Sequence, residues 1–410
     1  MGPTMGPLQN LRRREKNSPQ FRIFNLKIPL LFVLFTTLFF SSCFPHQPEA
    51  VQEIRLGSRI LQPQWNEKGT RLYFLTQAFL MGKEHIRDIV VWDGGRPRWL
   101  TTDRMIQEFW TDPSEDWITF EEYDPFLTEE NFQWAVFQPR SGKLEIVSKG
   151  DKPRGAGVFL PEKQWAFFGE YVYHKDNGKW NVLWQKEFPC RKRENALVGH
   201  NVLFLCAGAE EGLLKWEENH WKPVFTAQAG TIVDWHIPPD RKSVAIVAVQ
   251  QFGSAHPVSQ IFHLDEEAKV NLILSRPGKM IQLQSRDGDW LYWFEKEPFS
   301  DRYDTEVVYQ ISQKQIREQQ REKWLWKIFG GIQVYTLWEA RGILWQAPAG
   351  FLAIEAGKKK NPKKILEKSN IVEVSFSPDG RRLAITGVPK KNSPDRVLYV
   401  IEITHSGELN

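Results

Sequence analysis

Apolar and polar positions alternate in short runs along the chain, and the clearest run follows a turn motif near the carboxyl end. The motif is Ser-Pro-Asp-Gly at residues 377–380. Pro378 presets the backbone for a tight turn, and Gly380 allows the left-handed conformation that ends it. Leu383 and Ile385 then share one side of an extended segment. The pattern predicts a turn followed by a β-strand with a buried face.

The same alternation recurs eight times. The apolar pair that matches Leu383/Ile385 begins at residues 72, 118, 166, 202, 244, 291, 343 and 383, so the spacings are 46, 48, 36, 42, 47, 52 and 40 residues. Six copies follow turn-forming residues, whereas Val202/Phe204 and Ile343/Trp345 keep only the alternation. Several copies are followed by a second marker, a strand, a polar turn and another short strand, as in residues 89–101.

A repeat in the low to mid forties with about four short strands has the size of one β-propeller blade. We therefore predict an all-β fold, a β-propeller of eight four-stranded blades that occupies residues 51–410 as a single domain. Seven blades is the alternative if one degenerate copy is not a full blade. An open β-solenoid competes less well, because its repeats are usually shorter and more uniform.

The ring also needs a closure. Residues 51–56 resemble the last strand of a blade, and the final blade lacks residues for its own outer strand after about Ser406. We expect residues 51–56 to complete the blade made by residues 370–410, which would remove an open sheet edge.

Residues 377–384 resemble the repeat of the TolB-type, WD40-like propellers, which carry Ser-Pro-Asp-Gly-Lys/Arg-x-Leu-Ala. The resemblance spans about residues 51–410, but only this last copy is a full match. It implies the propeller architecture. It says little about a partner, because the repeat is a folding device.

Residues 1–42 have a different composition. A basic region is followed by an apolar core from Ile28 to Phe40 and by two small residues, which is typical of a secretory signal peptide. The sequence Phe40-Ser41-Ser42-Cys43 resembles a bacterial lipobox, so we predict lipidation of Cys43 and a short tether over residues 43–50. An ordinary cleaved signal and an uncleaved signal anchor are the alternatives, although the apolar run is short for a bilayer span.

The predicted compartment is the bacterial envelope, with the chain held at the outer membrane by its lipid. Phe44 favours the outer membrane, because an aspartate after the cysteine would favour retention at the inner membrane in enteric bacteria. A soluble periplasmic form and an inner-membrane anchor are the alternatives. The membrane is thus one expected partner.

Charge excludes a further class of partner. The whole chain has 54 basic and 50 acidic residues, but residues 43–410 hold 48 and 49, a net charge of −1. The mature domain has no positive excess to attract phosphate backbones, so we predict no nucleic-acid partner.

Candidate chemistry is sparse. Nine histidines are scattered without metal spacing, and Asp234 with His236 reads as one hydrogen-bonded pair near a blade edge. The neighbouring acids Glu121/Glu122 and Glu129/Glu130 point to opposite faces of a strand, which favours solvated blade-edge acids. We expect Cys190 and Cys206 to be two free thiols, although an oxidising periplasm would allow them to pair. We predict no catalytic residue, metal or cofactor.

Two features remain. Eighteen tryptophans is a high count, and those at strand positions (Trp65, Trp92, Trp117, Trp165, Trp293 and Trp345) are expected to fill the gaps between blades. Residues 312–327 have a helix-forming composition without an apolar stripe, which indicates an inserted loop or short helix on one rim.

These patterns favour a non-catalytic envelope lipoprotein whose propeller is a platform for protein–protein interaction or scaffolding. A glycan-binding module and a glycan-cleaving enzyme at the channel mouth are the alternatives, with a glycan as partner.

Overall fold

The computed structural model describes most of residues 51–402 and places them in β-strands and the turns between them. The residues outside the description are 1–50, 79–85, 113, 124–130, 209–211, 225–229, 239–240, 288–289, 301–303, 313–322, 328–332, 338–341, 348–349, 356–362, 368–369, 379–381, 389–395 and 403–410. Residues 48–410 form one compact unit. The predicted signal peptide, residues 1–42, and tether, residues 43–50, therefore lie outside the described residues.

The described strands form eight four-stranded antiparallel sheets. Blades 1 to 4 follow the chain in order: β2 (Arg59–Trp65), β3 (Leu72–Gln77), β4 (Arg87–Trp92) and β5 (Arg98–Trp99); β6 (Ile106–Thr111), β7 (Ile118–Tyr123), β8 (Phe132–Gln138) and β9 (Lys143–Gly150); β10 (Val158–Leu160), β11 (Trp165–Phe168), β12 (Tyr171–Asp176) and β13 (Lys179–Trp184); β14 (Lys192–Val198), β15 (Asn201–Ala207), β16 (Leu213–Glu217) and β17 (His220–Pro223).

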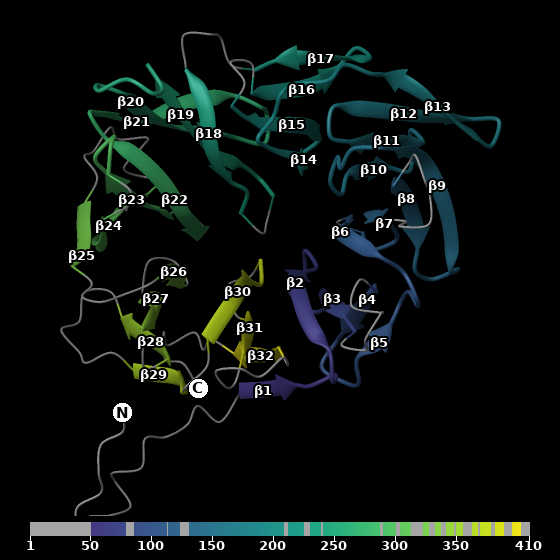
Figure 1. Ribbon diagram of the computed structural model, residues 1–410, viewed down its shortest axis with the longest axis horizontal. Helices are drawn as coiled ribbons and strands as arrows, with labels where there is room; N and C mark the ends of the chain where they lie inside the picture. The colour runs from purple at the N-terminus through teal and green to yellow at the C-terminus, as the bar shows by residue number, and fades with distance from the viewer. Residues whose placement is uncertain are drawn as a thin grey trace, which may run out of the picture. The chain divides into compact units, whose positions relative to one another are not determined.

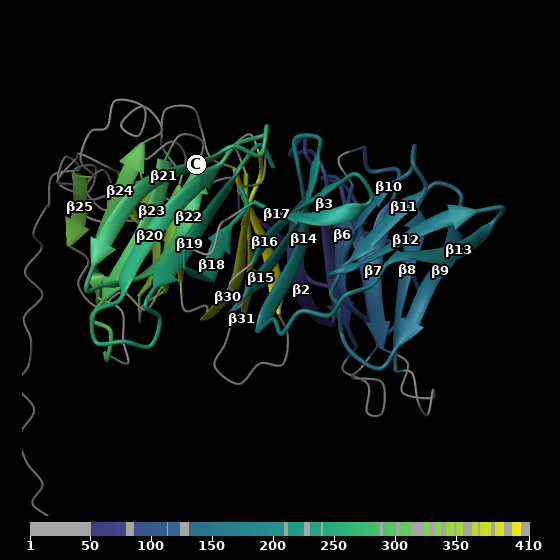
Figure 2. The same ribbon diagram turned by 90° about the horizontal axis from the view of Figure 1, so that it is seen from above.

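Blades 5 to 8 continue in the same way: β18 (Thr231–His236), β19 (Val244–Gln250), β20 (Val258–Leu264) and β21 (Val270–Pro277); β22 (Met280–Asp287), β23 (Trp290–Lys296), β24 (Asp304–Ser312) and β25 (Lys323–Lys327); β26 (Gln333–Leu337), β27 (Gly342–Ala347), β28 (Gly350–Glu355) and β29 (Lys363–Glu367); β30 (Asn370–Phe376), β31 (Arg382–Val388), β32 (Val397–Glu402) and β1 (Val51–Ile54). Figure 1 shows the sheets around a common centre, with the first strand of each blade innermost. Figure 2 shows the strands running between the two faces of the ring. The fold is the predicted β-propeller.

The ring closes as predicted. β1 pairs antiparallel with β32, and Val51 lies opposite Ile401 and Ile54 opposite Leu398. The amino-terminal strand thus supplies the outer strand of the blade that the carboxyl-terminal strands begin. Ile54 is buried at 6% exposure in an apolar cluster shared by blades 8 and 1.

The predicted turns set the start of the second strand in each blade. Each second strand begins at or one residue before the predicted apolar pair. Asn66, Asp112 and Ser377 each begin such a turn, and each accepts a side-chain hydrogen bond from the amide five residues on, at 2.9, 2.8 and 2.8 Å. The backbone N–H of each of the three residues also donates to the backbone carbonyl of the same residue five positions on. The side chain therefore satisfies a backbone group that the turn would otherwise leave unpaired.

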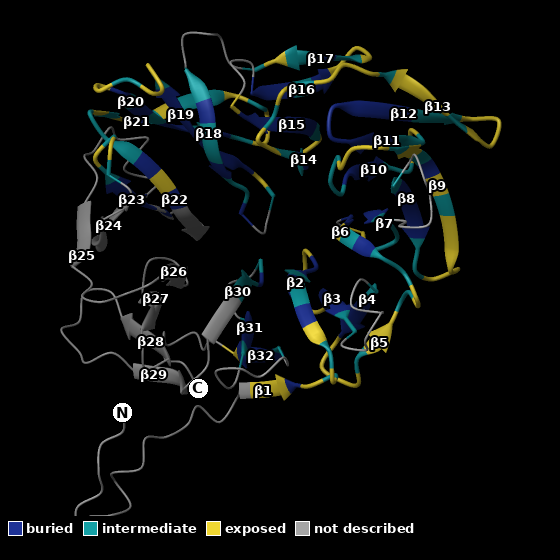
Figure 3. Ribbon diagram, in the orientation of Figure 1, coloured by how far each residue is buried: buried dark blue, intermediate teal, exposed yellow. Residues whose placement is uncertain are grey.

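The apolar core is distributed among the interfaces between blades. Each cluster of buried side chains among the described residues joins neighbouring blades, as where Val90 of β4 packs in one cluster with Leu398 of β32. Figure 3 shows that buried positions concentrate on inner and middle strands, whereas β5, β9 and β13 are largely exposed. Of the six strand tryptophans expected to fill these interfaces, Trp65, Trp92 and Trp293 are at most 8% exposed within such clusters. Trp117 and Trp165 are half-buried against two others, and the side chain of Trp345 lies outside the description.

Candidate functional site

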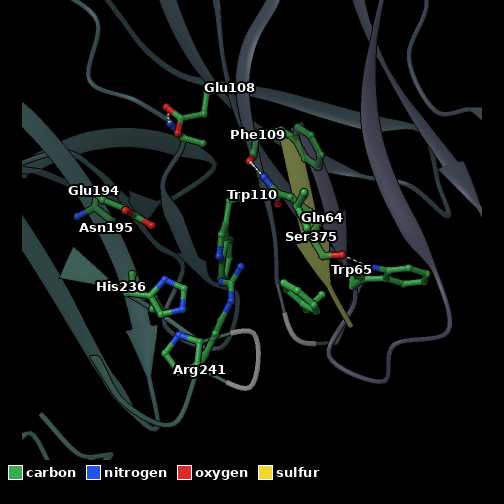
Figure 4. A pocket seen from close by; sticks show the side chains of 16 residues that line it. Gln64, Trp65, Glu108, Phe109, Trp110, Glu194, Asn195, His236, Arg241 and Ser375 are labelled. Atoms are coloured by element: carbon green, nitrogen blue, oxygen red, sulfur yellow. Dashed lines mark hydrogen bonds between the residues drawn. The ribbon is translucent and has the colours of Figure 1, made fainter. Parts of the chain in front are cut away.

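A cavity of about 330 Å³ lies where the innermost strands of blades 1, 2, 4, 5 and 8 surround the centre of the ring (Figure 4). We call it the channel pocket. Its aromatic walls are Trp65, Phe109, Trp110 and Phe376, and its polar side chains are Gln64, Glu108, Glu194, Asn195, His236 and Arg241. A small concave site with aromatic walls and a few convergent polar groups is the usual form of a ligand-binding pocket.

The two pocket glutamates occupy the same position in their blades. Glu108 of β6 and Glu194 of β14 each lie opposite a residue on the second strand of their blade. In both blades that residue is three positions after the first residue of the predicted apolar pair. Asp234 of β18 and Glu373 of β30 have the same register in blades 5 and 8. Four innermost strands therefore carry a carboxylate at one level of the ring.

Each of these carboxylates accepts a hydrogen bond from the next blade around the ring. The donors are three backbone amides and one indole N–H: Gln62 to Glu373 at 2.6 Å, Ala156 to Glu108 at 3.3 Å, Leu283 to Asp234 at 3.2 Å, and Trp235 Nε1 to Glu194 at 2.6 Å. In blades 1, 2, 5 and 8 the innermost strand has a register shift beside this position. Such bulges re-aim side chains and free backbone groups to bond elsewhere.

The channel walls change the acidity of these groups. The pKa of Glu108 is raised to about 7, mainly by burial and also by the nearby charges of Glu194 and Glu121, while the Ala156 amide and the charge of Lys192 oppose the shift. The Glu108 side chain nevertheless stays exposed to the channel. Burial also raises the pKa of Asp234 and of Glu373. Glu108 can therefore exchange a proton near neutral pH.

Arg241 reaches the pocket from the turn between β18 and β19. Its backbone is in the left-handed region at φ 52°, and its amide donates to the Pro238 carbonyl at 2.9 Å. Its guanidinium lies 4.6 Å from the ring centroid of Trp110, which belongs to β6, three blades away along the ring. Figure 4 shows the side chain running into the pocket toward that ring.

No described carboxylate forms an ion pair with Arg241, and among the described residues its side chain makes a ring contact with Trp110 but no hydrogen bond. Burial lowers its pKa to about 10, while the charges of Glu194, Asp112 and Glu67 raise it, so the guanidinium stays protonated at neutral pH. A partly buried cation without a paired anion is costly, because its desolvation is not offset by a partner. The arrangement leaves a donor fork ready for an anionic ligand.

Two buried acceptors in the same wall also lack a donor among the described residues. Gln64 uses its amide nitrogen to bond the Phe109 carbonyl at 2.9 Å, and Asn195 uses its nitrogen to bond the Gly169 carbonyl at 2.8 Å. Gln64 Oε1 and Asn195 Oδ1 have no hydrogen-bond partner in that set. Buried acceptors of this kind usually receive a donor from the protein, from water or from a ligand.

A second cavity, of about 510 Å³, lies where β14, β18 and β22 begin. Arg191 lies 5.9 Å from the ring centroid of Phe252, and Lys192 lies 4.3 Å from that of Trp235. Both cations are exposed to solvent. Because water already hydrates both cations, an anionic ligand would gain less by binding here than in the channel pocket.

Three interpretations from the sequence are corrected. Glu121 and Glu122 are 3% and 4% exposed, so they are not solvated edge acids. Glu121 accepts bonds from Trp134 Nε1 and from the amides of Arg154 and Gly155, which satisfy its charge inside the fold. Glu129 and Glu130 lie outside the described residues.

Asp234 does not bond His236, because its oxygens accept the amides of Trp235 and Leu283. Both residues lie on the innermost strand β18, where Asp234 lines the second cavity and His236 the channel pocket.

Cys190 and Cys206 form a disulfide, so the expectation of two free thiols is wrong. The polar loop before β14 folds back over β15, where the Arg191 amide donates to the Ala207 carbonyl at 2.9 Å. Cys190 is thereby brought against the buried Cys206. The sequence indicates that one cysteine lies in a loop and the other on a core strand. It does not show that the loop folds back over that strand.

Other expectations lie outside the description. Cys43, the predicted lipidation site, is in residues 1–50, and residues 313–322 of the predicted rim insertion are also outside. The end of that predicted insertion, residues 323–327, is the strand β25, not a loop or helix. Within the described residues, no group of three or more histidine, cysteine or acidic side chains is placed to hold a metal ion. No helix in the described part of the chain is long and apolar enough to cross a membrane.

The sequence analysis missed Glu108, Glu194 and Arg241. One signal was present: Glu108, Asp234 and Glu373 stand ten residues before the apolar pair of their repeat, and Glu194 stands eight before. Acids that recur on the innermost strands of a closed ring converge on its centre. No comparable signal marks Arg241, because its reach across the channel depends on a turn of one blade only.

No protein-family model and no curated protein matches the chain. Solved structures match by fold. The chain resembles one from a study of two prolyl endopeptidases, with a TM-score of 0.51 and 10% identity over 94% of this chain and 55% of that one. It thus spans about half the length of that chain.

It also resembles the Dos1 propeller, with a TM-score of 0.51 and 10% identity over 86% of this chain and 95% of that one. The propeller domain of the Trilobed protease from Pyrococcus furiosus matches at a TM-score of 0.46 and 10% identity, over 87% of this chain and 96% of that one. At this identity the likeness concerns the fold alone, and the fold is a β-propeller.

Proposed function

We propose that this chain is an exported, lipid-anchored β-propeller of the bacterial envelope that binds a partner protein at its channel pocket without catalysis. The observation that carries the proposal is the Arg241 guanidinium, which stacks on Trp110 inside the pocket and has no ion pair with a described residue. Natural pockets keep such a group when a ligand completes it.

Three features support export. Residues 1–42 have the order of a secretory signal, and Cys43 follows two small residues. The Cys190–Cys206 disulfide suits an oxidising compartment. The net charge of −1 for residues 43–410 gives no attraction to nucleic acid.

The anchor has a direct test. Cells grown with a labelled fatty acid should yield a labelled wild-type chain and an unlabelled Cys43→Ser variant, and only the wild-type chain should sediment with membranes. A labelled Cys43→Ser variant would exclude Cys43 as the lipid site.

The rigid ring supports a binding platform. Apolar clusters join neighbouring blades, and hydrogen bonds from one innermost strand to the next fix the pocket walls. A preorganised site loses little conformational entropy when a ligand binds.

Affinity capture from solubilised envelope, with the lipid anchor intact, tests the platform. We expect a protein partner that is recovered in stable proportion with the wild-type chain and is depleted with Arg241→Gln. Retention of the chain on peptidoglycan or polysaccharide, without a protein partner, would favour a glycan-binding module instead.

A second candidate rests on the two pocket glutamates. Glu108, with a pKa of about 7, and Glu194 line one cavity, and an acid–base pair of carboxylates is the usual equipment for glycoside cleavage. Incubation of the protein with a panel of glycans distinguishes the candidates. Turnover that Glu108→Gln or Glu194→Gln abolishes would replace the non-catalytic proposal with an enzyme.

A further inference from the structure

We propose that the channel pocket recognises the free carboxyl terminus of a peptide chain, with Arg241 binding the terminal carboxylate. This inference rests on the proposed platform function and names the part of the partner that enters the pocket.

The cation itself indicates a planar anion. A guanidinium presents a rigid fork of N–H donors that fits both oxygens of a carboxylate or phosphate. The Arg241 guanidinium carbon lies 4.6 Å from the centroid of the Trp110 ring, a contact that restrains the fork without using its N–H donors in an ion pair. Since no described carboxylate pairs with Arg241, an incoming anion displaces no internal ion pair.

The surrounding charges favour a singly charged anion. Glu194, Asp112 and Glu67 all act on the charge of Arg241, and Glu108 shares the pocket. One guanidinium facing several carboxylates cannot offset the charge of a phosphate dianion, because each added negative charge meets repulsion in an enclosed site. A carboxylate monoanion needs only the one cation.

The unpaired acceptors indicate what accompanies the carboxylate. Gln64 Oε1 and Asn195 Oδ1 lack donors in the described part of the chain, and the N–H groups of a peptide supply donors next to its terminal carboxylate. An acidic sugar fits less well, because sugars stack on open aromatic faces. Trp110 is only 8% exposed with Arg241 over its ring, and Trp65, also 8% exposed, donates its Nε1 to the Ser375 carbonyl at 3.0 Å.

The size of the cavity agrees with a chain end. About 330 Å³ is near the lower limit of the pockets that bury small ligands. It accommodates the last residues of an extended chain but not a folded loop. A chain terminus brings a carboxylate into so small a space with a backbone N–H group beside it.

The experiment uses two pools of short random-sequence peptides, one with free carboxyl termini and one with terminal amides. The lipid-anchored chain in detergent is equilibrated with each pool, and bound peptide is measured. We expect the amidated pool to bind at least about tenfold more weakly, as loss of a charge-assisted bidentate contact implies. Acetate should compete with the free-acid pool better than inorganic phosphate does.

Variants assign the effect to the guanidinium. Arg241→Gln should weaken binding of the free-acid pool at least about tenfold and remove the preference over the amide, and Arg241→Lys should give an intermediate loss because an ammonium lacks the fork. Arg140→Gln is the matched control, because Arg140 lies on the outer surface with a side chain 79% exposed. Circular dichroism melting checks that each variant is folded.

Equal binding of the two pools, no binding of either, or an unchanged affinity in folded Arg241→Gln would overturn the inference. Stronger competition by phosphate would also overturn it, in favour of a phosphate site. If envelope capture still yields a partner in these cases, the platform function stands. If the free-acid pool binds as expected but no envelope protein is captured, the platform function fails and the carboxylate site remains.

Discussion

Glu108 illustrates how the ring changes the chemistry of a single residue. On an open strand its side chain would be an ordinary solvated acid. Here the walls of the channel enclose it, and Glu194 and Glu121 add negative charge nearby, so its pKa rises to about 7. The enclosure follows from the meeting of several blades, which no local stretch of sequence specifies.

Stability should depend on pH through Glu108. Its pKa is higher in the folded protein than the ordinary value of 4.5, so the folded state binds more protons than the unfolded state between about pH 4.5 and 7. The free energy of unfolding should therefore fall as pH rises through this window. Denaturant unfolding of wild type and Glu108→Gln measures it, and the fall should be smaller in the variant. An equal pH dependence in both would contradict the assignment.

The disulfide also contributes to the stability of the protein, and this contribution can be measured. Cys190 and Cys206 are 16 positions apart, and closing a loop of that size stabilises a protein by about 3 kcal/mol in the chain-entropy model. Reduction should therefore lower the melting temperature of the wild-type chain. The Cys190→Ser variant should start lower and show no further change on reduction. A wild-type melting temperature that reductant does not move would show that the bond is absent or without effect.

At the scale of elements, turn chemistry and alternation were enough to predict the strands. Asn66, Asp112 and Ser377 begin turns whose side-chain bonds fix the start of the next strand, and these are local interactions that sequence specifies. The pocket was not predictable in the same way. Its residues are on the innermost strands, where bulges decide which side chain faces the channel, and Arg241 depends on Trp110 of a distant blade.

At the scale of elements, the testable prediction concerns the contribution of the closing strand β1 to stability. Deletion of residues 44–56 should lower the melting temperature markedly, because it removes the partner of β32 and exposes both an edge strand and the apolar cluster around Ile54. Ile54→Ala should lower the free energy of unfolding by about 2–4 kcal/mol, as truncation of a buried isoleucine usually does. Glu53→Ala, at an exposed position of the same strand, is the control.

An unchanged melting temperature after deletion of residues 44–56 would contradict the closure. Removal of residues 44–49 alone separates the role of the strand from that of the preceding tether, and it should leave the melting temperature near that of wild type.

At the scale of the whole molecule, closure of the ring produces both stability and a site. Apolar clusters of the described residues join neighbouring blades, and the register of the innermost strands brings four carboxylates to one level of the centre. The resulting pocket combines one cation without an ion pair to a described residue, aromatic walls and acceptors in need of donors. These properties support the proposal that the pocket receives a ligand from outside the chain.

Site-specific photo-crosslinking in living cells tests this account most directly. A photoreactive residue placed at Gln64, in the channel pocket, should give a discrete adduct with one envelope protein. The same residue at Val182, 54% exposed on the outer strand β13, should give none. The Gln64 adduct should disappear when Arg241→Gln is added. Adducts at Val182 but not at Gln64, or a Gln64 adduct that survives Arg241→Gln, would contradict the claim that the channel pocket holds the partner.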